Sequence, residues 1–166
     1  MNIRQFRDAD RSDLAALQIA SWRAAYVGLV DDEHLGPRLD REVTKRWREI
    51  SLGLGEFVLI AEDQEGFSGF VTLLAQEMPF IDNFHVRPGL YRSGIGRALM
   101  RATAVELLRL GETKVALTVL EANTRALAFY RALGGTEASH FEHEFLGRRQ
   151  PVIRIEWYDL EALSRV

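Results

Sequence analysis

The sequence predicts an α/β fold, with a mixed sheet of about seven strands flanked by about four helices in one domain. Short apolar runs alternate as in strands, while longer segments repeat apolar residues at helical spacing. A third observation is the stretch Ile81–Leu99, where an apolar run, a Pro-Gly loop and Gly94-Ile95-Gly96 lead directly into a helix. A domain covering residues 1–166 is long enough to bury a hydrophobic core.

The expected strands are short and separated by turn residues. They are residues 3–6, 57–62, 67–75, 81–86, 115–120, 137–145 and 152–158. The sequence DQEG after the second strand is typical of a hairpin, in which Gly66 can adopt a positive φ. We therefore expect the second, third and fourth strands to form an antiparallel meander. The fifth strand follows a strand-helix crossover and should pair parallel to the fourth.

The expected helices have recognisable ends. Asp10 and Asn123 are residue types preferred at the N-cap, and we expect them to cap the first and the last helix. Gly111 should end the long helix that starts at the glycine turn. Residues 30–39 should form a loop, because they are acidic and contain Gly36-Pro37. The predicted helices follow Asp10 and cover residues 41–50, 94–110 and 123–133.

Composition and charge exclude several functional classes. The net charge of −3 and the pI near 5.8 argue against a nucleic-acid binder. Without cysteine there is no disulfide framework, thiolate zinc site or cysteine nucleophile. His140 and His143 would point to opposite faces of a strand, so no metal site is expected. No segment approaches the ~20 apolar residues of a membrane span, and the first residues are polar, which favours a cytoplasmic protein without membrane contact.

The Gly94-Ile95-Gly96 turn has the outline of a phosphate-binding loop. At a helix start several backbone N–H groups are unpaired, and the positive end of the helix dipole lies behind them. A Rossmann fingerprint needs a third glycine at the position of Leu99, which this sequence lacks. A nucleotide P-loop needs Gly-Lys-Ser/Thr, whereas Gly96 is followed by Arg97-Ala98. Both of these nucleotide-binding classes are therefore excluded.

Two segments resemble the coenzyme A site of the Gcn5-related N-acetyltransferase (GNAT) superfamily. The first, V-R-P-G-L-Y-R-S-G-I-G-R-A-L at Val86–Leu99, resembles the pattern Arg/Gln-x-x-Gly-x-Gly/Ala at a helix start. The second has the spacing N-x-x-A-x-x-x-Y-x-x-x-G at Asn123, Ala126, Tyr130 and Gly134. The order of predicted elements also agrees along essentially the whole chain. The resemblance implies the single-domain GNAT fold, in which the fourth and fifth strands splay apart.

The resemblance also implies that the chain binds acetyl-coenzyme A and needs no metal. The sequence departs from the motif at Tyr91, where arginine or glutamine is usual, with Arg92 one place later. In the family the pyrophosphate is held mainly by backbone amides, which a different side chain at this position leaves intact. Residues expected at the coenzyme are Phe84, His85, Val86, Tyr91, Arg92, Ser93, Gly94, Ile95, Gly96, Arg97, Asn123, Ala126, Phe129 and Tyr130.

Direct transfer of the acetyl group to an amine, in a ternary complex and without a covalent enzyme intermediate, is the implied reaction. By resemblance, the backbone N–H of Val86 lies near the thioester carbonyl and serves as the oxyanion donor. Tyr130 matches the tyrosine that protonates the leaving sulfur, although a packing role for a helix tyrosine stays open. The alternative function is a noncatalytic acyl-coenzyme A sensor, which binds the same molecule without turnover.

The acceptor site is expected near the end of the first helix. Trp22 and Tyr26 either pack in the core or line a substrate pocket before the Gly28 loop, and Glu33 with His34 lies in that loop. Acceptors left open are a polyamine, an amino acid, an aminoglycoside-like amine and a protein amino terminus. The aromatic and acidic content of residues 22–34 mildly favours a cationic small molecule. A homodimer is also left open.

Several residues are candidates for the general base. Alternation places Asp82 on the strand face of Phe84 and Val86, where it could accept a proton from the amine through water. His85 has the better-matched pKa for this role, but alternation points it to the other face unless a bulge intervenes. Glu33 and His34 are further candidates from the early loop. We prefer Asp82.

Overall fold

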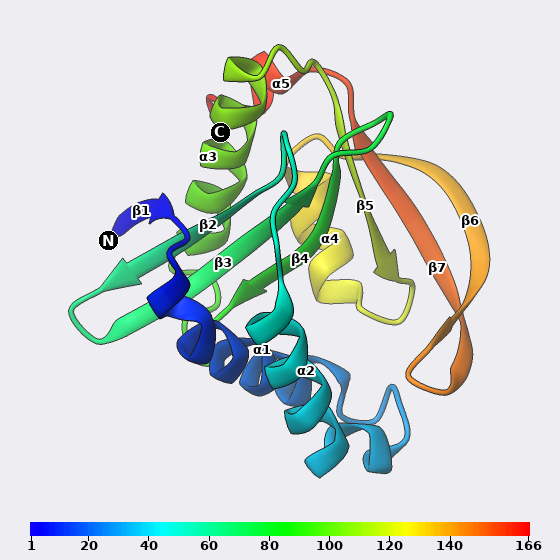
Figure 1. The fold of residues 1–166 in the computed structure, drawn as a ribbon. Helices are drawn as coiled ribbons and strands as arrows, with labels where there is room; N and C mark the ends of the chain where they lie inside the picture. Colours follow the sequence, from blue (N-terminus) through cyan, green and yellow to red (C-terminus); the bar gives the residue numbers. More distant parts are fainter.

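The chain folds around one mixed sheet of seven strands, with helices on both faces (Figure 1). The computed structural model describes residues 1–166. The strands are β1 (Asn2–Gln5), β2 (Phe57–Asp63), β3 (Gly66–Leu74), β4 (Phe80–Val86), β5 (Val115–Leu120), β6 (Thr136–Phe145) and β7 (Arg148–Trp157). The helices are α1 (Arg11–Tyr26), α2 (Pro37–Glu49), α3 (Ile95–Arg109), α4 (Thr124–Ala132) and α5 (Leu160–Leu163). Two short 3-10 helices, η1 (Asp8–Asp10) and η2 (Asp32–Leu35), precede α1 and α2.

The strand order is β1-β2-β3-β4-β5-β7-β6, and only β4 and β5 run parallel. The predicted meander and the predicted parallel fifth strand are both confirmed. β4 and β5 pair only at Phe80 with Ala116 and at Ile81 with Leu117, and beyond these positions the two strands separate (Figure 1). The separation leaves the β5-facing edge of β4 unpaired from Asp82 to Val86, in the middle of the sheet.

A β-bulge at Asp82 interrupts the alternation of β4. Thr72 pairs with Asn83 and Leu73 pairs with Ile81, so Asp82 has no partner on β3. A bulge adds one residue to a strand and thereby changes which side chains share a face.

The bulge corrects the expectation that Asp82 shares a face with Phe84 and Val86. Phe84 and Val86 pack against the larger hydrophobic core, on the side of α3 and α4. Asp82 instead forms an ion pair with Arg46 of α2, on the opposite side of the sheet. His85 also lies on the α1 side, against Phe70.

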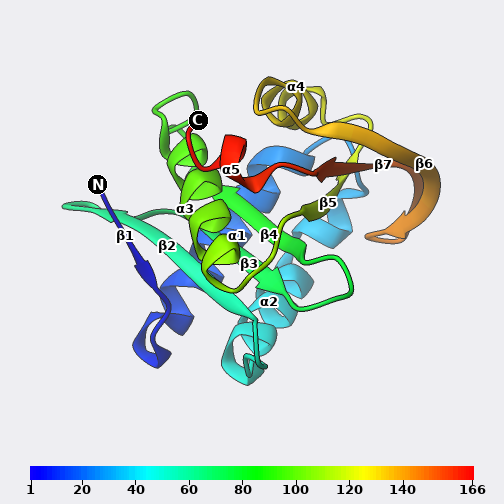
Figure 2. The ribbon, with the colours of Figure 1, turned by 90° about the horizontal axis from the view of Figure 1, so that it is seen from above.

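Helices cover both faces of the sheet (Figure 2), and each face has its own hydrophobic core. The larger core contains 22 buried residues, with Leu99, Leu117 and Ile155 among them, and joins the sheet to α3, α4 and α5. The smaller core contains nine buried residues around Trp47 and Phe70 and joins the sheet to α1 and α2. Burial of this apolar surface is the main favourable contribution to folding.

The hairpin formed by β6 and β7 reaches the connection between α1 and α2. Arg148 Nη2 donates a hydrogen bond to Asp31 Oδ1 at 2.9 Å. Gly147, with φ of +75°, packs directly against the His34 ring, and a side chain at this position would collide with the imidazole. Segments more than 100 residues apart in the chain are therefore in contact at the hairpin tip.

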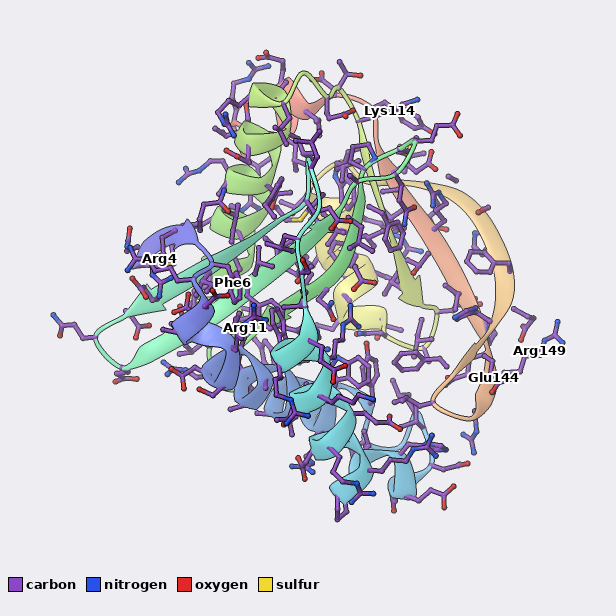
Figure 3. The ribbon with its side chains drawn as sticks, in the orientation of Figure 1. Arg4, Phe6, Arg11, Lys114, Glu144 and Arg149 are labelled. Carbon is purple, nitrogen blue, oxygen red and sulfur yellow. The ribbon has the colours of Figure 1, made fainter.

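Asp10 has a different role from the predicted N-cap. Its carboxylate accepts a hydrogen bond from the Arg7 backbone N–H at 2.7 Å and forms a two-pronged ion pair with Arg4 at 2.7 and 2.9 Å. The hydrogen bonds from Arg4 hold the pKa of Asp10 below its ordinary value. The Arg11 guanidinium lies 5.4 Å from the centroid of the Phe6 ring, so ion-pair and cation–π contacts hold the segment from β1 to the start of α1 together (Figure 3).

Helix α2 begins earlier than predicted, at Pro37 instead of residue 41. Proline fits the first helical position because its missing N–H would be unpaired there. The sequence prediction also missed α5 and placed the start of the last strand four residues too late. Gly111 has φ of +85° after α3, as expected for a helix C-terminus. None of the helices is long and apolar enough to span a membrane.

Candidate active site

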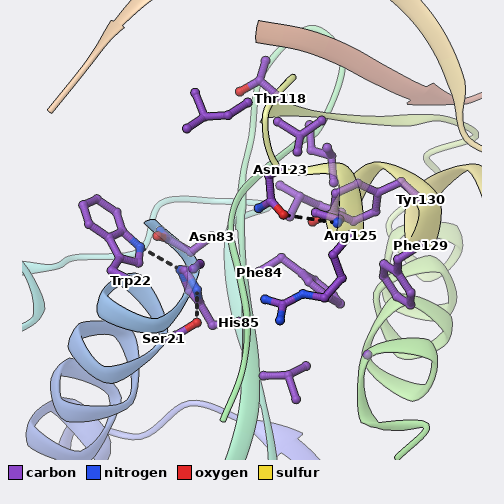
Figure 4. A pocket seen from close by; sticks show the side chains of 18 of the residues that line it. Ser21, Trp22, Asn83, Phe84, His85, Thr118, Asn123, Arg125, Phe129 and Tyr130 are labelled. Carbon is purple, nitrogen blue, oxygen red and sulfur yellow. Dashed lines mark hydrogen bonds between the residues drawn. The ribbon is translucent and has the colours of Figure 1, made fainter. Parts of the chain in front are cut away.

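A cavity of about 930 Å³ passes through the gap between β4 and β5 (Figure 4). Its walls come from α1 and α2 on one side of the sheet and from α3 and α4 on the other, with the end of β6 closing one side. The volume is within the range of small-molecule sites. Because β4 and β5 are not hydrogen-bonded here, the cavity connects the two faces of the sheet.

At one end of the cavity the glycine loop presents unpaired backbone N–H groups. Arg92 (φ +66°) and Gly94 (φ +87°) have left-handed backbone conformations and turn the chain into α3. No backbone hydrogen bond is donated by the N–H groups of Tyr91, Arg92, Gly94, Ile95, Gly96 and Arg97. These donors lie at the positive end of the α3 dipole, an arrangement that binds phosphate groups.

The side chains of the loop divide between the core and the cavity. Ile95 is buried in the larger core, and the Ser93 hydroxyl donates to a carbonyl of its own loop at 2.6 Å, so neither side chain lines the cavity. Gly96 lines the cavity, and a Cβ there would lie 3.1 Å from Cζ of Phe129. The predicted contribution of Ser93 and Ile95 is therefore limited to their backbone.

Three arginines and Tyr91 surround the same end of the cavity. Arg92 and Arg97 come from the loop and the first turn of α3, and Arg125 comes from the first turn of α4. The Arg125 guanidinium stacks over the Tyr91 ring, 3.8 Å from its centroid. The Tyr91 hydroxyl is buried without a hydrogen-bond partner. None of the three arginines forms an ion pair within the protein.

The β3–β4 ladder directs two amides of β4 into the gap. The Arg87 backbone N–H donates to the Ser68 carbonyl at 2.8 Å, which makes these residues a hydrogen-bonded pair of the antiparallel ladder. Such pairs alternate with non-hydrogen-bonded ones, so the N–H groups of Phe84 and Val86 point away from β3. They face the space from which β5 has separated.

Tyr130 of α4 has a buried ring and lines the cavity. The ring packs against Phe84, Phe129 and Trp157, with centroid distances of 6.1, 5.4 and 5.8 Å. Its hydroxyl opens to the cavity and is therefore not a buried group without a hydrogen-bond partner. Burial raises the pKa of Tyr130 well above its ordinary value, and nearby Tyr26 adds to the shift. The phenol therefore stays protonated and can donate a hydrogen bond.

Asn123 forms the predicted cap of α4. Its Oδ1 accepts a hydrogen bond from the Ala126 backbone N–H at 3.2 Å, which confirms the N-cap (Figure 4). Both residues line the cavity. The capping bond uses only the oxygen of the amide, so the Asn123 Nδ2 group is available as a donor.

Aromatic side chains form a wall on the α1 side of the cavity. Trp22 and Tyr26 at the end of α1 lie 5.7 Å apart between ring centroids, and Phe145 of β6 lies 5.5 and 5.0 Å from them. All three line the cavity. Burial raises the pKa of Tyr26 to about 12, so it is also protonated at neutral pH.

His85 is held on the α1 side by two hydrogen bonds. The Trp22 indole N–H donates to His85 Nε2 at 3.2 Å, and Ser21 Oγ lies 3.0 Å from Nδ1 (Figure 4). An indole nitrogen can only donate, so Nε2 is unprotonated and Nδ1–H faces Ser21. Burial, with a smaller contribution from the charge of Arg46, lowers the pKa of His85 to about 3. His85 is neutral and faces α1, as alternation predicted, so its side chain points away from the α3 and α4 side.

Asp82 also lines the cavity from the α1 side. Its Oδ2 accepts hydrogen bonds from Arg46 Nη2 and, at 2.7 Å, from Asn83 Nδ2. Asn83 Oδ1 in turn accepts from Gln18 at 3.0 Å, and Gln18 Oε1 accepts from the Trp47 indole at 2.7 Å. This chain of side chains anchors Asp82 to both helices of that face.

Glu33 and His34 do not line the cavity. The Glu33 side chain is 82% exposed, and His34 packs under the tip of the β6–β7 hairpin. Arg46, Arg125 and Phe145 do line it, although the sequence patterns did not single them out. No group of three or more histidine, aspartate or glutamate side chains is placed to hold a metal ion.

The chain matches the model of the acetyltransferase (GNAT) family over residues 17–134. It is 25% identical to the uncharacterized N-acetyltransferase YuaI of Bacillus subtilis (strain 168), over 99% of this chain and 96% of YuaI.

Solved structures share the fold. The PaiA N-acetyltransferase from Thermoplasma acidophilum, in complex with coenzyme A, has a TM-score of 0.72 and 16% identity, over 94% of this chain and 98% of that one. The structure of yncA from Salmonella typhimurium, with its cofactor acetyl-CoA, has a TM-score of 0.68 and 18% identity, over 95% of this chain and 93% of that one. The family match includes the glycine loop and the segment from Asn123 to Gly134. The chain therefore belongs to the acetyltransferase (GNAT) family.

Proposed function

We propose that the chain transfers an acetyl group from acetyl-coenzyme A to a primary amine, by direct attack of the amine within a ternary complex. One observation carries this proposal: a single cavity joins the unpaired amides before α3 to the aromatic wall on α1, through the gap between β4 and β5. A donor bound along one half and an amine bound in the other half would meet at the gap.

The residues present fit a coenzyme A molecule. The N–H groups of Gly94, Gly96 and Arg97 would hold the pyrophosphate, with each hydrogen bond to a charged acceptor contributing roughly 1.5–3 kcal/mol. The backbone of Phe84 and Val86 would pair with the amides of the pantetheine arm in the manner of an added strand. Coenzyme A and acetyl-CoA are present in the PaiA and yncA structures. When bound, acetyl-coenzyme A supplies the activated acetyl thioester.

Val86 and Tyr130 would act on the thioester. The Val86 N–H is directed into the gap and would donate to the negative charge that develops on the carbonyl oxygen. The Tyr130 hydroxyl, held protonated by burial, would donate to the leaving sulfur. The protein has no cysteine, which agrees with direct transfer to the amine.

Asp82 would take the proton of the amine through a water molecule. Its Oδ2 is occupied by Arg46 and Asn83, whereas Oδ1 has no partner and lies on a residue that lines the cavity. His85 is a poorer candidate, since Nε2 already accepts from Trp22 and Nδ1 carries the proton.

The test is release of free thiol from acetyl-coenzyme A across a panel of amines, with mass spectrometry of the acetylated product. We expect thiol release that depends on the amine and a product heavier by one acetyl group. Binding of coenzyme A by calorimetry, with no thiol release on any amine, would instead support the sensor function. No binding of coenzyme A would contradict both.

A further inference from the structure

The acceptor half of the cavity has almost no free negative charge. Asp82 is the only carboxylate among the residues that line the cavity, and it is already paired with Arg46. Asp31, in the loop after α1, is paired with Arg148 outside the cavity. Apart from Asp82, nothing in this half offers a carboxylate to a second ammonium group of a polyamine, which would also meet the charge of Arg46.

Arg46 has hydrogen-bonding capacity that the protein does not use. Only its Nη2 has a partner, on Asp82, and the side chain is 47% exposed where it lines the cavity. The other N–H groups of the guanidinium form a planar fork that matches a carboxylate. The charge of Arg46 already acts on this half of the cavity, because it contributes to the neutral state of His85.

We propose that the acceptor is a monoamine with an apolar or aromatic body and a carboxylate near the amine, as in an amino acid. Its carboxylate binds Arg46, and its body packs against the wall formed by Trp22, Tyr26 and Phe145. This inference rests on the proposed acetyl transfer and names its substrate class. A small hydrophilic amine would gain little from contact with the same aromatic wall.

The experiment compares L-phenylalanine, 2-phenylethylamine and spermidine as acceptors in the wild-type protein, Arg46→Gln and Arg46→Lys. We expect Arg46→Gln to lower kcat/KM for phenylalanine at least about tenfold more than for phenylethylamine, whose smaller loss reports only the effect of Arg46 on Asp82. Arg46→Lys, which keeps the positive charge, should retain part of the preference for phenylalanine over phenylethylamine. Arg48→Gln is the matched control, because Arg48 lies on the same helix and its side chain does not line the cavity.

Two outcomes would overturn the substrate class. One is that spermidine or phenylethylamine is the better acceptor, and the other is that Arg46→Gln lowers kcat/KM equally for all three amines. Calorimetric binding of N-acetylphenylalanine to the coenzyme A complex tests the subsite without turnover. Binding that depends on Arg46, with no thiol release on any amine, would refute the proposed transfer while supporting the subsite; binding unchanged in Arg46→Gln refutes the subsite.

A second inference concerns the coenzyme end of the cavity and rests on a separate contact. Tyr91 stands where the family motif has arginine or glutamine, and the Arg125 guanidinium covers its ring at 3.8 Å. Stacking fixes the plane of the guanidinium and leaves its N–H groups free at the edge. Arg125 therefore holds a positive charge beside the loop whose amides are unpaired.

The geometry points to Arg125 as the coenzyme-phosphate ligand that replaces the side chain missing at position 91. Calorimetry with coenzyme A should give about tenfold weaker binding for Arg125→Ala, and the added substitution Tyr91→Arg should restore most of this loss. Binding of pantetheine, which has no phosphate, should be the same with and without Arg125. Arg101→Ala is the control, because Arg101 is an exposed arginine of α3 outside the cavity.

Unchanged coenzyme A affinity in Arg125→Ala would refute this role. An equal loss for coenzyme A and pantetheine would also refute it, since the effect would then not come from the phosphates. If the double variant Tyr91→Arg with Arg125→Ala keeps its melting temperature but does not regain affinity, an arginine at position 91 cannot replace Arg125 as a phosphate ligand.

Discussion

The Tyr130→Phe variant isolates the contribution of one hydroxyl group. The ring keeps its packing against Phe84, Phe129 and Trp157. The hydroxyl opens to the cavity, so its removal leaves no protein group without a partner. We therefore expect the free energy of unfolding and the affinity for coenzyme A to change by less than about 1 kcal/mol.

The effect on turnover follows from the acidities involved. Proton transfer from a tyrosine of pKa ~10 to a thiolate of pKa ~8.5 is uphill by about 2 kcal/mol, and burial raises the pKa of Tyr130 further. The hydroxyl should therefore stabilise the departing thiolate mainly as a hydrogen-bond donor. A hydrogen bond to a charged group contributes roughly 1.5–3 kcal/mol, which corresponds to a fall in kcat of about 10- to 150-fold.

The assay measures kcat from thiol release at saturating amine and the coenzyme A affinity by calorimetry. Equal losses in kcat and affinity would refute the catalytic assignment and indicate packing. The pH profile gives a second check, because the raised pKa keeps Tyr130 protonated at least up to about pH 10. The reasoning would also be refuted if, as the pH is raised, the kcat of the wild-type protein fell before that pH was reached while the kcat of Tyr130→Phe did not.

Three further substitutions test other parts of the site. Gly96→Val directs methyl groups at the Phe129 ring, which is 3.1 Å from a Cβ built there, so coenzyme A affinity should fall at least about tenfold; unchanged calorimetric affinity would place the coenzyme elsewhere. The pKa of His85 is about 3 in the folded protein and about 6.5 in the unfolded chain. Between these two pH values only the unfolded chain binds a proton at this side chain. The wild-type protein should then lose about 1.4 kcal/mol of stability per pH unit relative to His85→Gln, and parallel urea-unfolding profiles would contradict this. Asp82→Asn should lower kcat/KM about 10- to 100-fold near pH 7 and less at pH 9.5, where more amine is neutral; a pH-independent ratio would exclude Asp82 as the base.

Local sequence signals predicted the fold, the glycine turn before α3 and the cap of α4. The turn at Gly94 and Gly96, the cap at Asn123 and the parallel fifth strand each follow from a few neighbouring residues. The spacing of apolar residues identified all seven strands, with errors at their ends. Such features are encoded within one or two elements, so they can be recognised without tertiary information.

The acceptor end was less accessible to sequence reasoning, because it depends on contacts between distant segments. Phe145 reaches Trp22 only because the hairpin tip docks on the loop after α1. The bulge that turns Asp82 toward Arg46 has no local signal in the sequence IDNFHV, where simple alternation is the default expectation. Arg46 lies on an amphipathic helix like any solvent-facing arginine, until the fold places it beside the cavity.

The separation of β4 and β5 also affects the mechanics of the protein. At one end the two halves of the sheet are joined by two residue pairs and by packing of α5 on α3. At the opposite end β4 and β5 do not pair, and the halves meet only through side chains such as Phe145 against Trp22. A molecule held between the strands would supply the missing contacts across the open end. Since it would bind only the folded chain, a concentration of 100 times its Kd would add about 2.7 kcal/mol to stability. The melting temperature and the resistance to proteolysis should therefore both rise with the concentration of the molecule bound between the strands.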